Sequence, residues 1–171
     1  ISSDEGIGKM PDLINDYIVQ NNKDPDGWNL AFTDPATGDL FFGISYLDHT
    51  GKTCIANQYK RITSDTTELK SGNYYVGGSV TINRRLNVTG NVLLILTDGS
   101  LLTVNGGIRL EGSNTLTITS QSLDEKMGRL VSIANKAGYA GIGGDPGTDF
   151  IHAQGNACGT LNILGGDIYA E

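Results

Sequence analysis

The stretch that decides the fold is Ser79–Thr119, which reads SVTINRRLNVTGNVLLILTDGS and then LLTVNGGIRLEGSNTLTIT. Each part contains three short segments in which apolar residues alternate with other residues. The apolar pair Val80 and Ile82 returns 22 residues later as Leu102 and Val104. Alternating segments of this kind, repeated at a fixed period of about 20–30 residues, are typical of a β-solenoid.

The same repeat predicts which strands stack on one another. We expect the following pairs: Leu86 and Val88 on Ile108 and Leu110, Leu93 and Ile95 on Leu116 and Ile118, Val131 and Ile133 on Leu102 and Val104, and Leu161 and Ile163 on Leu116 and Ile118. Because successive side chains of a strand point to opposite faces, Thr81, Asn87 and Leu94 are then expected to point outward.

We therefore predict a mainly β chain with a parallel β-helix, or β-solenoid, over residues 69–171. Its coil is expected to be right-handed, because crossovers between parallel strands almost always are. A β-sandwich does not explain a repeat in register. The chain stops inside a coil, so we expect the solenoid to be truncated at its C-terminal end. The predicted core consists of Val80, Leu93, Ile95, Leu102, Val104, Ile108, Leu116, Ile118, Leu161 and Ile163.

Residues 1–68 lack this repeat and predict a small N-terminal α+β cap. Residues 11–21 form the expected helix, since they combine an early proline with one apolar stripe. Segments at 28–33, 40–47 and 53–62 are separated by Pro, Gly and Asp turns, which favours small antiparallel hairpins.

Composition excludes several classes of function. The 171 residues carry a net charge of −7, and the densest basic group is the pair Arg84 and Arg85, so we expect no nucleic-acid partner. No apolar run is long enough for a membrane span. No motif indicates a cofactor. The two cysteines, Cys54 and Cys158, fit either a disulfide or two buried thiols.

One segment resembles the first half of a calcium loop. Asn22, Asp24 and Asp26 place oxygen-bearing side chains at alternate positions before Gly27. Thr33 stands where a bidentate glutamate is expected, and an ordinary Asp-Pro-Asp-Gly turn explains the same residues. We therefore predict a plain turn and no metal site, with these three residues as a weak calcium candidate.

The outward positions of the regular coils offer no pair of carboxylates. Carbohydrate-active enzymes on β-helices need clustered carboxylates, or carboxylates beside Arg or Lys, so no catalytic residue is predicted. A binding module instead uses exposed aromatic side chains or a polar groove. The weak candidates for such a role are Tyr139, Phe150 and Tyr169.

A series of short motifs runs through most of the chain: YLDHTGK at Tyr46–Lys52, TSDTT at Thr63–Thr67, SGNYYV at Ser71–Val76, VLLIL at Val92–Leu96, AGIGG at Ala140–Gly144 and CGTLNILGG at Cys158–Gly166. In order and spacing this series resembles a family of large surface proteins of gut bacteria that carry repeated Gly-Ile-Gly-Gly units. The resemblance implies a wall-anchored or secreted multidomain protein and no catalytic residues. It does not reach residues 1–45, and the insertion 145–157 is longer than the family pattern.

These observations together favour a non-catalytic, extracellular module of a bacterial cell surface or cell wall. It would act as an adhesin or a structural spacer, with glycan or a host or bacterial surface protein as its partner. The alternative is a carbohydrate-active β-helix enzyme, either a polysaccharide lyase or a glycoside hydrolase.

Overall fold

The structure is a computed structural model, and it describes residues 23–33, 40–147 and 155–171. All regular elements of these residues are β-strands, which confirms the prediction of a mainly β chain. The helix expected at residues 11–21 lies outside the described part. Within the described part, no helix is long and apolar enough to cross a membrane.

The strands follow the expected order of short segments, and the longest are β7 and β9. Their bounds are β1 Asn29–Leu30, β2 Phe32–Thr33, β3 Leu40–Phe42, β4 Ile44–Leu47, β5 Thr53–Ala56, β6 Gln58–Arg61, β7 Glu68–Val76, β8 Ser79–Ile82, β9 Leu86–Leu96, β10 Leu101–Asn105, β11 Ile108–Arg109, β12 Thr115–Ser120, β13 Arg129–Ile133, β14 Ile142–Gly143, β15 Thr160–Ile163 and β16 Asp167–Ala170.

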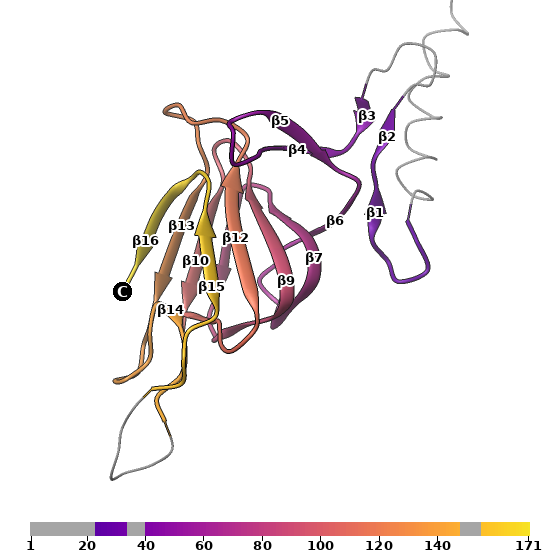
Figure 1. The fold of residues 1–171 in the computed structure, drawn as a ribbon. Coiled ribbons are helices and arrows are strands. Elements are labelled where there is room, and N and C mark those ends of the chain that lie inside the picture. Colours follow the sequence, from indigo (N-terminus) through magenta and orange to yellow (C-terminus); the bar gives the residue numbers. More distant parts are fainter. Residues whose placement is uncertain (1–22, 34–39, 148–154) are drawn as a thin grey trace, which may run out of the picture.

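One sheet stacks a single strand from each successive coil of the chain. It contains β8, β10, β13 and β16, and every neighbouring pair is parallel. Figure 1 labels β10, β13 and β16 of this sheet. Leu102 of β10 lies opposite Val80 of β8 on one side and Leu130 of β13 on the other. The predicted stacking of Val80 on Leu102, and of Ile82 on Val104, is confirmed.

The second sheet stacks the remaining strands of each coil. β9 pairs in parallel with β7, with β11 near its first residues and with β12 near its last. β14 and β15 extend this sheet beyond β11 and β12. Leu86 lies opposite Ile108, as predicted, and Leu116 opposite Leu161. Since β9 and β12 run parallel, the β-sandwich alternative is not supported.

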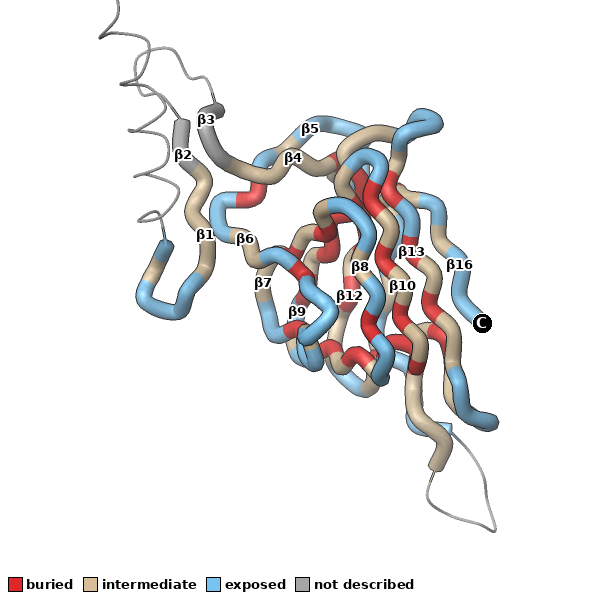
Figure 2. Tube along the Cα trace, turned by 180° about the vertical axis from the view of Figure 1, so that it is seen from behind, coloured by how far each residue is buried: buried red, intermediate tan, exposed pale blue. Residues whose placement is uncertain are grey.

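The apolar core lies between these two sheets, where buried residues alternate along the strands (Figure 2). Each buried Leu or Ile contributes about 1.5–3 kcal/mol to folding before entropy is counted. Among the predicted core residues, Val80 and Leu161 are partly buried and pack against this core. The fully buried ones that belong to it are Leu102, Val104, Ile108, Leu116 and Ile118.

The predicted phase of residues 91–96 is wrong. Val92 and Leu94 point into the core and lie opposite Leu116 and Ile118, whereas Leu93 is only half-buried. Five consecutive apolar residues contain no alternation, so the sequence does not fix which set faces inward. Ile95 is buried as predicted, but it lies outside the core cluster between the sheets.

Two further expectations about the later coils are wrong. Leu130, and not Val131, lies opposite Leu102, so Ser132 takes the buried position that was predicted for Ile133. Ser132 is tolerated there because its hydroxyl donates a 2.6 Å hydrogen bond to the carbonyl of Gly141. Ile163 is 52% exposed.

The strands that precede β7 are mostly antiparallel hairpins, as predicted: β2 pairs with β3, and β4 with β5. The second hairpin lies against β12, where Thr119 donates a 2.6 Å hydrogen bond to the carbonyl of Leu47. β6 differs, because it joins the second sheet in parallel with β7, and Ile62 directly after it belongs to the core. Cys54 and Cys158 are free thiols.

Candidate functional site

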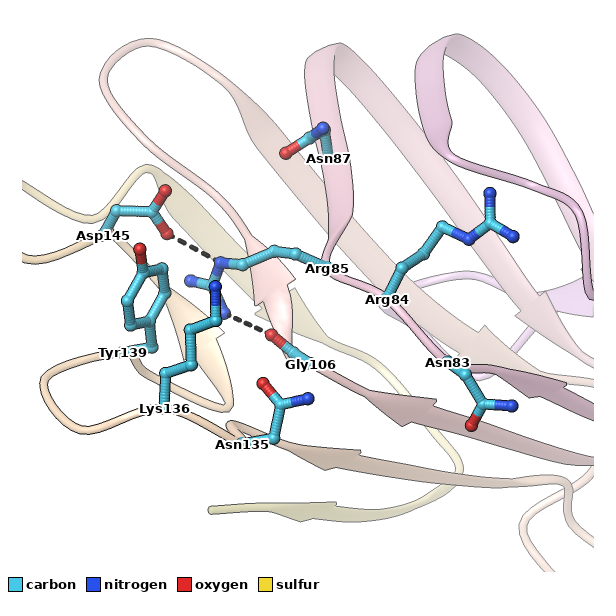
Figure 3. A pocket seen from close by; sticks show the side chains of 9 residues that line it. All are labelled: Asn83, Arg84, Arg85, Asn87, Gly106, Asn135, Lys136, Tyr139 and Asp145. Carbon is cyan, nitrogen blue, oxygen red and sulfur yellow. Dashed lines mark hydrogen bonds and ion pairs between the residues drawn. The ribbon is translucent and has the colours of Figure 1, made fainter.

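A hollow of about 430 Å³ lies where three successive coils turn from the first sheet toward the second (Figure 3). The turns follow β8, β10 and β13, and they comprise residues 83–85, 106–107 and 134–141. The third turn is the longest, and it forms one wall of the hollow. The lining residues are Asn83, Arg84, Arg85, Asn87, Gly106, Asn135, Lys136, Tyr139 and Asp145.

Arg85 ties the three turns together. Its Nε donates a 2.6 Å hydrogen bond to Oδ1 of Asp145, and one terminal nitrogen donates 2.9 Å bonds to the carbonyls of Gly106 and Ala140. The other terminal nitrogen lies 3.3 Å from the carbonyl of Gly143. The side chain is only 16% exposed. With its donors occupied in this way, Arg85 is a structural clamp at the floor of the hollow.

The glycine pair of the second turn makes room for this clamp. A Cβ at Gly106 would lie 2.6 Å from the backbone of Arg85, and a Cβ at Gly107 would lie 2.5 Å from the Arg85 guanidinium. Gly107 also has a φ of 74°, a conformation that residues with a Cβ rarely adopt. The pair Gly106 and Gly107 is therefore required by the close approach of the neighbouring turns.

Asp145 is held on its other side by a second charged network. Its Oδ2 lies 3.3 Å from Nε of Arg109, and a terminal nitrogen of Arg109 lies 2.7 Å from Glu111. Glu111 also accepts hydrogen bonds from the backbone N–H of Asp145 and from the amide of Asn156. The hydrogen bond from Arg109, followed by that from the Asp145 backbone, lowers the pKa of Glu111 from 4.5 to about 2.

Tyr139, one of the predicted binding candidates, lies in the wall of the hollow. Its ring centroid is 5.0 Å from the guanidinium carbon of Arg85 and 5.8 Å from the ammonium of Lys136. Figure 3 shows the ring standing beside both cations. The aromatic ring therefore orders the cationic side chains through cation–π contacts.

Several polar groups of the hollow make no hydrogen bond or ion pair with the residues that the structure describes. Arg84 and Lys136 are exposed, and neither takes part in an ion pair or side-chain hydrogen bond within the part of the chain that the structure describes. The amides of Asn87 and Asn135 are likewise unbonded there. The lining thus combines three cations and one carboxylate on a chain whose net charge is −7.

The other two binding candidates do not join this site. Phe150 lies outside the described residues. Tyr169 is 46% exposed on β16, where its hydroxyl donates a 2.6 Å hydrogen bond to Glu171, and it does not line the hollow. Sequence reasoning found Tyr139 but missed the cations around it. The adjacent pair Arg84 and Arg85 was the available signal.

The calcium candidate has the geometry of a turn. Asp24 Oδ1 accepts hydrogen bonds from the backbone N–H of Asp26 at 3.0 Å and of Trp28 at 2.9 Å. Its Oδ2 accepts a 3.2 Å bond from the amide of Gln58, and Gly27 has a φ of 78°. Asn22 lies outside the described residues. Within the described ranges, no three His, Cys, Asp or Glu residues are grouped so as to hold a metal ion.

The arrangement of the hollow suits binding better than acid–base chemistry. Both oxygens of Asp145 are ion-paired to arginines, and Glu111 is held ionised by its partners. A general acid needs a proton to give near neutral pH, which a carboxyl with a pKa of about 2 lacks. Unbonded amides and cations, by contrast, are ready to contact a ligand.

Comparisons with known proteins add no further constraint. Neither a protein-family model, nor a curated protein, nor a solved structure matches this chain. The resemblance to surface proteins of gut bacteria therefore stays a prediction, and the geometry of the hollow is the basis for proposing a function.

Proposed function

We propose that this chain is a non-catalytic module of a bacterial cell surface, built as a right-handed parallel β-helix, and that it acts as an adhesin that binds glycan. The parallel stacking of strands from successive coils supports the β-helix. The right-handed coil is the expected hand for parallel crossovers. The extracellular location rests on the resemblance of the sequence motifs alone.

One observation favours an adhesin over a plain spacer. The hollow presents polar side chains that make no hydrogen bond or ion pair with the described residues. A spacer needs only solvated corners, whereas this corner gathers the amides of Asn87 and Asn135 with the cations of Arg84 and Lys136. Amides offer both donors and acceptors, which is what sugar hydroxyl groups require. The volume of about 430 Å³ is that of a small-molecule site.

A glycan array probed with the whole chain tests this proposal. We expect binding to a subset of glycans, and we expect Asn87→Ala/Asn135→Ala to weaken it about tenfold. The matched control is Asn57→Ala/Asn91→Ala, two exposed asparagines outside the hollow whose side-chain amides make no hydrogen bond to the described residues. Failure to bind any glycan would leave a structural spacer as the better account.

The enzyme alternative is tested on the same samples. A reducing-end assay and an absorbance assay for unsaturated products would detect a glycoside hydrolase and a polysaccharide lyase respectively. We expect neither activity on any polysaccharide that the chain binds. Turnover that disappears in Glu111→Gln or Asp145→Asn would overturn the non-catalytic assignment.

A further inference from the structure

We infer that the hollow takes the carboxylate-bearing sugar unit of an acidic glycan, with Arg84 and Lys136 as its anion-binding residues. This inference rests on the proposed glycan-binding function and specifies the class of sugar. Three observations support it. Among the described residues, two cations of the hollow have no carboxylate partner, unbonded amides line the same hollow, and the ring of Tyr139 contacts cations.

The cations that line the hollow, and Arg109 beside it, differ in their partners. Arg85 and Arg109 are both neutralised by Asp145, and Arg109 also by Glu111. Arg84 and Lys136 have no such partner within the described residues. They extend from the first and third turns, and in Figure 3 Lys136 points toward Arg85 whereas the Arg84 guanidinium points away from both. Two unpaired positive charges that line one cavity favour an anionic ligand.

The size of the hollow and its neutral side chains limit what that anion is. Unbonded amides at Asn87 and Asn135 flank the cations and match hydroxyl groups in hydrogen-bonding capacity. A net charge of −7 opposes an extended polyanion such as nucleic acid, because the rest of the surface repels it. A single carboxylate surrounded by hydroxyl groups satisfies both constraints, and a uronic or sialic acid unit has this chemistry.

Tyr139 supports the cationic character of the hollow. Its ring lies 5.0 Å from the guanidinium of Arg85 and 5.8 Å from the ammonium of Lys136. These cation–π contacts position the two cations at the wall of the hollow, where an acidic sugar would meet them.

Isothermal titration calorimetry on the whole chain tests the inference. The probes are trigalacturonate, a hyaluronan tetrasaccharide and sialyllactose, each compared with its carboxyl-reduced or asialo counterpart, together with free acetate and phosphate. We expect at least one acidic probe to bind ten times more tightly than its neutral counterpart and to weaken as NaCl is raised. Arg84→Gln/Lys136→Gln should reduce that affinity at least tenfold.

The matched control is Lys52→Gln/Lys126→Gln, which removes the same charge from two exposed lysines outside the hollow. It should leave binding unchanged, and far-ultraviolet circular dichroism verifies that all variants fold. The inference is overturned if no acidic probe binds, if both double variants weaken binding equally, or if phosphate binds as tightly as the acidic sugars. Neutral glycans binding as well as acidic ones would refute the inference and leave the proposed function intact, whereas no binding on the array would refute both.

Discussion

The strands between residues 79 and 119 and the later strand β15 share one alternating pattern but bury it to different extents. In the earlier strands, inward residues such as Leu102 and Ile118 are fully buried. In β15, Leu161 is partly buried, and Ile163 remains 52% exposed. The difference teaches that burial in a stack depends on neighbours on both sides, and that alternation alone does not create a core.

Ile118 and Ile163 give the largest expected contrast, because they lie opposite each other in adjacent strands. Ile118→Ala removes a fully buried side chain and should lower the free energy of unfolding by about 2–5 kcal/mol. Ile163→Ala should cost about 0.5 kcal/mol, because half of that side chain already faces water. Urea unfolding followed by circular dichroism measures both, and equal losses would break the comparison.

Two glycines with positive φ, Gly107 and Gly112, lie in turns that differ in how closely other atoms approach. Gly112→Ala meets no atom within 4 Å and should cost about 1–2 kcal/mol from backbone conformation alone. Gly107→Ala should cost about 1–3 kcal/mol more, because its Cβ would strike Arg85 and the carbonyl of Ala140, which come from the turns on either side. Chemical unfolding of the two variants tests this, and a Gly107→Ala protein as stable as Gly112→Ala would contradict it.

Two arginines extend the contrast to charged side chains. Arg85→Gln should destabilise by about 2 kcal/mol, because it removes a charge-assisted bond to Asp145 and leaves carbonyls in the turns without their donor. Arg129→Gln breaks a pair with Asp167 whose side chains are 53% and 57% exposed, so it should cost less than about 1 kcal/mol. Thermal melts rank the two, and the reverse order would show that Arg85 contributes little.

A pH dependence is expected at Glu111. Its pKa falls from 4.5 to about 2 on folding, so the carboxylate stabilises the fold above pH 4.5, and this contribution disappears as the pH falls toward 2. The stability difference between the wild-type chain and Glu111→Gln should therefore shrink across that window. Glu125→Gln, at an exposed carboxylate that accepts no hydrogen bond from the described residues, is the control. If the stability difference between the wild-type chain and Glu111→Gln stays constant from neutral pH to pH 2, folding does not lower the pKa of Glu111.

Strict alternation is the reason that part of the fold could be predicted. SVTI and LLTV each place two apolar residues on one face, and the register of β8 with β10 follows directly from them. The run 92–96 lacks that signal. In β13 the alternation predicted the wrong inward face. Val131 and Ile133 flank a buried serine whose hydroxyl donates a hydrogen bond to the carbonyl of Gly141. Local pattern does not reveal such a long-range hydrogen bond.

The candidate site was harder to predict than the fold, because the contacts that build it join distant residues. Arg85 reaches Asp145, 60 residues further along the chain, and two carbonyls 55 and 58 residues away. Tyr139 could be named as an exposed aromatic residue, but nothing in the sequence places it beside that arginine. Only the stacking of three turns brings these groups together.

The clamp made by Arg85 also bears on how the stack would come apart under tension, which the proposed place on a cell surface would impose. A pull at the C-terminal end first separates β16 from β13 and β15 from β12, where exposed contacts such as the Arg129–Asp167 pair add to the strand pairing. Detaching the next coil must in addition break the bonds from Arg85 to Asp145 and Ala140. In a single-molecule force trace the third rupture should therefore need more force than the first two, and Arg85→Gln should remove that step.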